Sequence, residues 1–431
     1  MRQVIIAGGG LAGLAAAAAL AEAGFGVDLY ESRPALGGRA SSFALGRAGE
    51  LIDNSQHVLL RCCTSLLDFY RRLGVAGRIR FHREFRFVEP GGRVSVFRPG
   101  QGTLRSLLAL MRLRFLSTAD KLSLVRGLAA LRRESRSPAE LDRITMLDWL
   151  RGRRQTRGAI ARFWRPVLVS AINEELDRMA ASHGLQVFRI GLLAGAGAHE
   201  MGVPEVPLSE LCEAARRLPN VAIHLRTPVE RLVIAEDRVR GASVNGELRQ
   251  ADSYIAAVPF ERIGALAPEL DLDLTAFEHS PIAGIHLWFD RPVMDLPQAA
   301  LLDRTIQWTF NKSGGRYVLV VVSAARGLMA MDRAEVIALA LRELAEFFPR
   351  VREARLERSH LFKELRATFS ARPGLEAHRP PARTRIANLF LAGDWTRTGW
   401  PATMEGAVRS GYLAAEAVAA GVRLDCPRGP A

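Results

Sequence analysis

The chain has 431 residues, of which 48% are hydrophobic and 24% charged, and its formal net charge is +14. This length suits two domains rather than one compact core, and the composition is ordinary for a folded globular protein. The positive charge favours anionic partners. Nucleic acid is excluded as an expected partner, because the chain has no nucleic-acid-binding motif and no face that interleaves aromatic and basic residues.

The first 31 residues predict a βαβ unit. Residues 2–7 (RQVIIA) are predicted to form a buried strand, residues 11–24 an Ala-rich helix, and residues 26–31 (GVDLYE) a second, parallel strand. Hydropathy alone would also allow residues 4–27 to be a signal peptide or a transmembrane helix. The five glycines before Phe25 and the acid Glu22 favour the strand, turn and helix.

A glycine-rich turn joins the first strand to the helix and has the pattern G-x-G-x-x-G. In such turns the first glycine permits a tight bend, the second lets the backbone approach a pyrophosphate, and the third allows close helix packing. The helix N-terminus then offers free N–H groups to the phosphate. Glu31, at the end of the second strand, can accept hydrogen bonds from a ribose diol. We therefore expect a dinucleotide at Gly8, Gly10, Leu11, Ala12, Gly13 and Glu31.

The middle of the chain has a different pattern. Residues 104–133 and 140–194 are predicted to be mostly helical, because their apolar residues recur every three or four positions. Predicted strands follow at 221–225, 229–236, 239–244, 248–257, 281–290 and 316–323, then a helix at 332–347, a strand at 388–391 and a helix at 405–420. Strands typical of the nucleotide domain thus recur at both ends of the chain and near 221–257, which predicts a discontinuous domain with two insertions.

Residues 103–133 combine seven basic residues with one acid, Asp120, and with Leu, Met and Phe at helical spacing. Basic amphipathic helices of this kind bind the interface of an anionic membrane. The same pattern is expected of a lid over a substrate tunnel, with arginines on its wet face. Both readings stay open.

The four cysteines are Cys62, Cys63, Cys212 and Cys426. Their spacing is not that of zinc ligands, and they suggest no disulfide framework. We expect no metal site and a reduced, cytoplasmic compartment.

A second motif follows the glycine turn directly. Residues 31–39 read ESRPALGGR, which resembles the E-x-R-x-x-x-G-G-R segment of the amine oxidase and phytoene desaturase flavoprotein superfamily. The resemblance implies FAD rather than NAD, with Arg39 offering a forked donor to a phosphate. An arginine on a solvated loop is the alternative. The segment adds Ser32, Arg33, Gly37, Gly38 and Arg39 to the expected cofactor contacts.

A third motif lies at the other end of the chain. Residues 389–411 read LFLAGDWTRTGWPATMEGAVRSG and resemble the superfamily segment that runs along the ribityl chain and flavin ring. Asp394 matches the acid that accepts ribityl hydroxyl bonds, and Met404 and Glu405 begin the helix expected to face the pyrimidine end. Because residues 394–406 contain no Cys, non-covalent FAD is implied. Further cofactor contacts are expected from Asn54, Val229, Gly393, Asp394, Ala402, Thr403 and Met404.

Residues 49–57 (GELIDNSQH), with the VLLRCCTSLLDFYRRLGV that follows, resemble the squalene-associated branch, the hydroxysqualene dehydroxylases of bacterial hopanoid biosynthesis. The resemblance implies reductive removal of the hydroxyl of hydroxysqualene to give squalene. The alternatives are a carotenoid- or squalene-type desaturase, a flavin amine oxidase, and an FAD-binding structural protein without activity. His57 is the first candidate for proton donor, with a structural histidine as the alternative. Asp53 is the second candidate, and it would otherwise brace the Gly38–Arg39 loop.

The expected fold is α/β: a Rossmann-like FAD-binding domain with an interleaved α+β substrate domain and a helical cap. Residues 1–80, 205–262 and 380–431 are assigned to the FAD domain, and residues 81–204 and 263–379 to the substrate domain. The expected partners are a C30 isoprenoid, an unidentified electron donor and an anionic membrane. The expected location is the inner face of the cytoplasmic membrane, with peripheral attachment.

Overall fold

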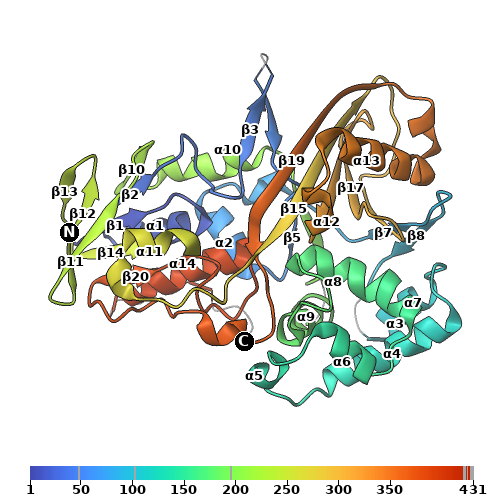
Figure 1. Ribbon diagram of the computed structural model, residues 1–431, viewed down its shortest axis with the longest axis horizontal. Coiled ribbons are helices and arrows are strands. Elements are labelled where there is room, and N and C mark those ends of the chain that lie inside the picture. The colour runs from blue at the N-terminus through green and yellow to red at the C-terminus, as the bar shows by residue number, and fades with distance from the viewer. Residues whose placement is uncertain (47–48, 101–102, 195–196, 421–423, 425, 428–431) are drawn as a thin grey trace.

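The computed structural model describes residues 1–46, 49–100, 103–194, 197–420, 424 and 426–427. One half of the molecule is built around a parallel sheet and the other around a larger, mostly antiparallel sheet, with a group of helices beside the larger sheet (Figure 1). Within these ranges, no helix has both the length and the apolar character needed to cross a bilayer.

The first sheet has five strands in the order β10, β2, β1, β14, β20, and every pairing in it is parallel. Its strands are β1 (Gln3–Ala7), β2 (Gly26–Glu31), β10 (Val221–Leu225), β14 (Ser253–Ala256) and β20 (Leu389–Leu391). Helix α1 (Leu11–Glu22) connects β1 to β2, which confirms the predicted βαβ unit. Because the strands come from three separate stretches of sequence, this half of the molecule is discontinuous along the chain.

Helix α1 is enclosed between the first sheet and the last helix, α14 (Met404–Val418). Every residue of α1 from Leu11 to Ala21 is buried, as expected of a helix that is apolar on all sides. The approach of α14 requires Gly411, because a Cβ there would lie 2.2 Å from the carbonyl oxygen of Ala12. The apolar run near the N-terminus is thus part of the core.

The second sheet has seven strands in the order β19, β15, β18, β17, β16, β7, β8. They are β7 (Phe85–Val88), β8 (Val94–Phe97), β15 (His279–Phe289), β16 (Gln298–Leu301), β17 (Trp308–Ser313), β18 (Tyr317–Ser323) and β19 (Leu356–Phe369). Helix α13 (Arg333–Phe347) covers one face with Val336, Ala340 and Leu344. The other face carries Trp308 and Phe310 and is turned toward the large cavity described below.

A helical cap lies beside this sheet (Figure 1). It contains α3 (Thr103–Met111), α4 (Thr118–Arg132), α5 (Pro138–Leu141), α6 (Met146–Gly152), α7 (Arg157–Ala159), α8 (Arg165–Ile172) and α9 (Ala181–Gln186). Two segments, η2 (Ile160–Trp164) and η3 (Val187–Leu192), are π-helical. Such wide turns are rare in proteins overall, but those that occur are often found at functional sites. Side chains from both segments line the cavity.

Smaller elements complete the two halves. Three minor sheets contain β3 (Ser42–Leu45), β4 (Glu50–Asp53), β5 (Leu59–Leu60), β6 (Ile79–His82), β9 (Met201–Pro204), β11 (Arg231–Ala235), β12 (Arg238–Val244) and β13 (Glu247–Arg249). The remaining α-helices are α2 (Thr64–Arg72), α10 (Leu208–Glu213), α11 (Phe260–Leu266) and α12 (Arg326–Met329).

The structure differs from the sequence expectations at several strands. Residues 248–257 were expected to form one strand, but they contribute to β13 and β14, which belong to different sheets. Residues 356–369 were assigned no element, but they form the 14-residue strand β19. Its sequence, LERSHLFKELRATF, spreads charged residues over both faces, so a period of two is not visible.

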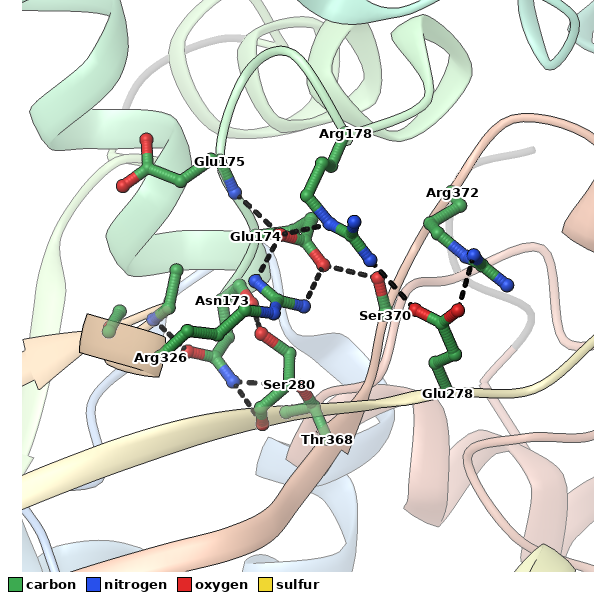
Figure 2. Close-up of polar contacts among 12 residues, drawn as sticks. Asn173, Glu174, Glu175, Arg178, Glu278, Ser280, Arg326, Thr368, Ser370 and Arg372 are labelled. Atoms are coloured by element: carbon green, nitrogen blue, oxygen red, sulfur yellow. Dashed lines mark hydrogen bonds and ion pairs between the residues drawn. The ribbon is translucent and has the colours of Figure 1, made fainter. Parts of the chain in front are cut away.

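A buried polar junction ties the cap to the second sheet (Figure 2). Glu174, whose exposed fraction is 0%, accepts two hydrogen bonds of 2.7 Å from the Arg326 guanidinium and one from the Ser370 hydroxyl. Burial alone would raise the pKa of Glu174, but these donors hold it below its usual value. The carboxylate thus stays charged and joins the end of α8 to α12 and to the end of β19.

Asn173 completes this junction. It ends α8 in the left-handed region, with a φ of 61°, a conformation that asparagine tolerates better than most residues. Its amide donates to the Ser280 carbonyl oxygen and the Thr368 hydroxyl, each at 2.9 Å, and its oxygen accepts from the Ala324 N–H at 2.7 Å. Asn173 also lines the cavity, so the same side chain anchors the cap and forms part of the cavity wall.

Candidate functional site

The glycine turn after β1 leaves no room for side chains on its protein side. Gly8 has a φ of +113°, and a Cβ there would lie 2.4 Å from the carbonyl oxygen of Ala257. At Gly13 a Cβ would lie 2.0 Å from the carbonyl oxygen of Gly8. Gly10 differs, because the nearest atom to its missing Cβ is Gly38 Cα, at 3.9 Å. The backbone at Gly10 therefore borders the cavity, where a phosphate can approach the N-terminus of α1.

Glu31 stands at the end of β2 beside this turn and is 7% exposed. One carboxylate oxygen accepts from the Gly9 N–H at 2.7 Å, and the other accepts from the Arg33 N–H at 2.8 Å and the Ser32 hydroxyl at 3.1 Å. These bonds fix the orientation of the carboxylate, which retains lone-pair capacity toward the cavity. Glu31, Ser32, Arg33 and Val229 all line the cavity, as a ribose site at this end requires.

Arg39 and Asp394 form an ion pair, with 2.5 Å between Nη2 and Oδ1. They were expected from the sequence to act separately, Arg39 on a phosphate and Asp394 on the ribityl chain. Arg39 also donates to the carbonyl oxygen of Ala367 at 3.1 Å. Burial alone would lower the pKa of Arg39, but the charge of Asp394 more than compensates and keeps the guanidinium protonated. Both side chains line the cavity beside Gly37, Gly38 and Gly393, so a ligand there meets the pair as one unit.

Three buried polar atoms in the cavity wall have no partner among the described residues. They are Oδ1 of Asn54 and the Nε1 atoms of Trp308 and Trp400. A buried polar atom without a partner costs free energy of about 1–3 kcal/mol, so each marks a place where a bound ligand supplies a donor or acceptor. The Asn54 acceptor, the Trp400 donor, the glycine turn and Glu31 together fit the polar groups of FAD.

His57 lies on the same wall, and its Nδ1 is 3.2 Å from the Ser55 carbonyl oxygen. Burial lowers the pKa of His57, and the nearby Asp53 carboxylate only partly opposes that shift. The imidazole is therefore mostly neutral at neutral pH. Its contact with Ser55 places a proton on Nδ1 and leaves Nε2 for another partner.

Asp53 does not appear on the cavity wall among the described residues. One of its oxygens accepts from the Ser42 hydroxyl at 2.7 Å and from the Leu208 N–H, at the start of α10, at 3.0 Å. The other oxygen lies 3.8 Å from the Lys312 ammonium. Asp53 therefore braces β3, α10 and the second sheet from behind the wall. A role in the chemistry remains a prediction, and from this position it acts through its neighbours.

The N-terminus of α14 forms another part of the wall. Ala402, Thr403 and Met404 line the cavity, and the Thr403 hydroxyl caps the helix by accepting from the Gly406 N–H at 3.0 Å. Glu405 is 1% exposed, and its carboxylate accepts from the N–H groups of Ser65 and Leu66, at 3.1 and 2.7 Å. Glu405 thus caps α2, a connection that the sequence did not suggest.

The wall residues described above, which do not include Asp53, border one cavity of about 750 Å³. Beyond the polar end, its walls become aromatic and aliphatic. This apolar part includes Phe87, Phe97, Phe163, Phe188, Trp308 and Phe310. Phe163 comes from η2 and Phe188 from η3, so the cap and the second sheet enclose the apolar end together. The alternation of Trp308, Phe310 and Lys312 along β17 was a usable strand signal that sequence reasoning missed.

Comparison with known proteins gives a consistent family. The family model described as flavin containing amine oxidoreductase matches residues 11–419. The hydroxysqualene dehydroxylase of Rhodopseudomonas palustris is 30% identical, with 98% of this chain and 99% of the relative covered. A probable zeta-carotene desaturase of Synechococcus elongatus is 27% identical, with 96% and 98% covered.

Solved structures agree on the fold. An oxidoreductase from Methanosarcina mazei superposes with a TM-score of 0.72 at 16% identity, covering 96% of this chain and 99% of that one. Putrescine oxidase bound to putrescine superposes with a TM-score of 0.68 at 18% identity, covering 97% and 99%. At these identities the likeness establishes the architecture and leaves the substrate open.

The Glu31→Ala variant is expected to bind FAD about 10- to 150-fold more weakly, because it loses charged hydrogen bonds worth about 1.5–3 kcal/mol. The measurement is flavin content after purification, followed by titration of the apoprotein with FAD. Asp28→Ala is the matched control, since Asp28 lies on the same strand and bonds to His224. Unchanged affinity in the Glu31 variant would remove this residue from the FAD site.

The family match covers nearly the whole chain, and the glycine turn, Glu31 and the partnerless polar atoms offer what a flavin dinucleotide requires. Residues 394–406 contain no cysteine for a covalent link. The chain belongs to the flavin containing amine oxidoreductase family, and its cofactor is FAD.

Proposed function

We propose that this FAD-dependent oxidoreductase acts on an isoprenoid lipid, and that its reaction is the reductive dehydroxylation of hydroxysqualene to squalene. The observation that carries the proposal is the continuity of the cavity. One space joins the dinucleotide cradle to an apolar compartment walled by the cap and the second sheet. Relatives named for hydroxysqualene and carotenoid substrates align with 95–98% of the chain, which supports a lipid of this class.

The proposed reaction breaks the allylic C–O bond and forms a C–H bond at the same carbon. When bound, reduced FAD supplies the hydride. The chain must supply one proton, so that oxygen leaves as water, and must keep other water away. The aromatic rings of Trp308 and Phe310, which line the apolar compartment, can also stabilise the positive charge that develops as the hydroxyl departs.

His57 is the proposed proton donor, since it is a titratable side chain on the wall of the same cavity. Its lowered pKa makes the protonated form a minority at neutral pH, and that form is a stronger acid than an ordinary imidazolium. Each turnover also requires an external electron donor to reduce FAD.

A second candidate is FAD-dependent desaturation of an isoprenoid, which runs hydride transfer in the opposite direction. The carotenoid desaturases among the relatives favour it, since they match 95–97% of the chain. Amine oxidation ranks lower. Lys312, on β17 of the substrate half, bonds to Gln56 and is not part of the described cavity wall.

Peripheral membrane contact through α3 and α4, at the inner face of the cytoplasmic membrane, is part of the proposal. Leu108 and Leu122 are 50% and 51% exposed, and Met111 is 38% exposed. Arg105, Arg112, Arg114, Arg126, Arg132 and Arg133 are also exposed on this segment. No described side chain of α3 or α4 is part of the cavity wall. Phe115, in the connection between the two helices, packs behind the wall residue Phe87, with 5.1 Å between ring centroids. A membrane-bound cap would let an insoluble C30 lipid enter from the bilayer.

The direction of the chemistry decides between dehydroxylase and desaturase. Enzyme reduced without oxygen is expected to be reoxidised by hydroxysqualene, with one squalene formed per flavin. Flavin absorbance and product analysis by mass spectrometry measure the two quantities. A desaturase would give the opposite result. A more saturated isoprenoid would bleach the flavin of the oxidised enzyme, and the reduced enzyme would not react with the allylic alcohol.

His57→Gln is expected to slow this reoxidation by roughly 10²–10⁴-fold, the usual range for general acid catalysis, while FAD stays bound. In the unmodified enzyme the rate should rise as the pH falls toward the lowered pKa of His57, because protonation creates the acid. The variant should lose this pH dependence. His199→Gln is the matched control, as His199 also lines the cavity and burial also lowers its pKa. Equal rates in unmodified enzyme and His57→Gln would make His57 structural.

Membrane contact is testable with vesicles of neutral phosphatidylcholine and increasing anionic phosphatidylglycerol. Co-sedimentation should rise with anionic lipid and fall with salt, as expected of screened charge. The double variant Leu108→Gln with Leu122→Gln should bind less. The control pair is Leu248→Gln with Leu365→Gln, which are 49% and 60% exposed on other surfaces. The proposed contact would be contradicted if binding did not depend on lipid charge and was unchanged in the Leu108→Gln with Leu122→Gln variant.

A further inference from the structure

Lys312 reaches from the second sheet to the wall of the cavity. It lies on β17, two residues after Phe310, and its ammonium donates to the Gln56 side-chain oxygen at 2.9 Å. The same ammonium lies 3.8 Å from Asp53, and the side chains of Lys312 and Asp53 are only 22% and 5% exposed. A charged group of the substrate half thus contacts two residues of the FAD half.

Both contacts of Lys312 are themselves held. Asp53 is fixed by the Ser42 hydroxyl and the Leu208 N–H on its far side. Gln56 is 8% exposed and lines the cavity, and its amide donates to the His57 carbonyl oxygen at 3.3 Å. The ammonium therefore fills the gap between a braced carboxylate and the segment that carries His57.

Stability alone gives no reason for a charge at this position. A buried ion pair usually adds little over an apolar pair of the same size, because both charges lose their hydration. Burial lowers the pKa of Lys312, and only the Asp53 carboxylate opposes that effect. An apolar side chain of similar length would avoid this cost but would leave the Gln56 oxygen without its donor.

We propose that Lys312 is a positioning residue for the reaction: held by Asp53, its ammonium orients Gln56 and thereby fixes His57 on the cavity wall. The part that concerns proton transfer rests on the proposed function, since it takes His57 as the proton donor. The positioning itself does not depend on which lipid the enzyme transforms.

The charges around His57 make this arrangement measurable. Asp53 on β4, Arg39 on the loop after Gly38, and Lys312 on β17 face the imidazole, along with the Ser55 carbonyl. Asp53 raises the pKa of His57, whereas Arg39 and Lys312 lower it. Lys312 is faced by Asp53 and by the imidazole of His286. Burial, with help from His360 and Lys312, lowers the pKa of His286 to about 3, so that ring stays neutral.

Removing the charge of Lys312 and removing the charge of Asp53 should therefore shift the pKa of His57 in opposite directions. Lys312→Met should raise the pKa of His57, and Asp53→Asn should lower it. Each change should be roughly 0.5–1 pH unit, because charges in direct contact shift a pKa by about 1–3 units and neither of these touches the ring. If Lys312 and Asp53 had only a structural role, both variants could change the pKa of His57, but the two changes would not have opposite signs.

The measurement is an NMR titration of the FAD-loaded enzyme labelled with ¹⁵N-histidine, with His57→Gln used to assign the signal. Lys363→Met is the matched control, since Lys363 also lies in the second sheet and bonds to the carbonyl oxygens of Met329 and Met331. The control should leave the His57 titration unchanged. Lys312→Gln keeps a donor for Gln56 without the charge, so it should raise the pKa even if Lys312→Met does not fold. Shifts of the same sign in the Lys312 and Asp53 variants, or none, overturn the proposal.

The pH profile of flavin reoxidation by hydroxysqualene separates this proposal from the proposed function. If both hold, the profile moves to higher pH in the Lys312 variants and to lower pH in Asp53→Asn, in step with the NMR titration. If the NMR shifts appear and the profile does not move, positioning by Lys312 stands and His57 is not the proton donor.

Discussion

The absence of two Cβ atoms determines how the FAD half is assembled. Gly13 allows α1 to start directly against the Gly8 carbonyl oxygen, and Gly411 allows α14 to lie against α1. Adding even a methyl group at either position would bring carbon to within 2.2 Å of a carbonyl oxygen, which no rotamer change relieves. Because α1 is thus held between sheet and helix, its N-terminus points at one fixed place in the cavity, and the rest of the FAD site is arranged around that place.

The two halves of the molecule meet at residues 53–57. On one side Asp53 is tied to β3 and α10, and on the other Lys312 approaches from the second sheet. A Cβ at Gly284 of β15 would lie 2.6 Å from the Asn54 carbonyl oxygen, so the sheet also packs directly against this segment. The part of the cavity wall formed by residues 54–57 therefore depends on both halves.

Sequence reasoning was most successful where local geometry dictates the residue type. The glycine turn, the βαβ unit and the acid after β2 are demanded by contacts within about 30 residues, so their pattern is visible in the chain. The pairing of Arg39 with Asp394, and of Glu405 with the start of α2, joins residues more than 300 positions apart. Such contacts depend on tertiary arrangement, for which a single sequence carries no local signal.

The same limit applied to the second sheet. Strand β19 carries charge on both faces, so it does not show the alternation typical of a half-buried strand. The aromatic lining of the cavity was missed for a similar reason. Phe163 and Phe188 lie in π-helical turns, which shift side chains away from the positions that a period of 3.6 predicts.

The junction between Asn173, Glu174 and Arg326 has a consequence for how such enzymes can diversify. The cap supplies Asn173 and Glu174, whereas Arg326, Ser280 and Ser370 come from the body of the substrate half (Figure 2). A cap transplanted from a relative would bring its own residue at position 174 against this body's Arg326. Where that residue is not an acid, the Arg326 guanidinium loses its counter-charge, and removing one partner of a buried ion pair is strongly destabilising.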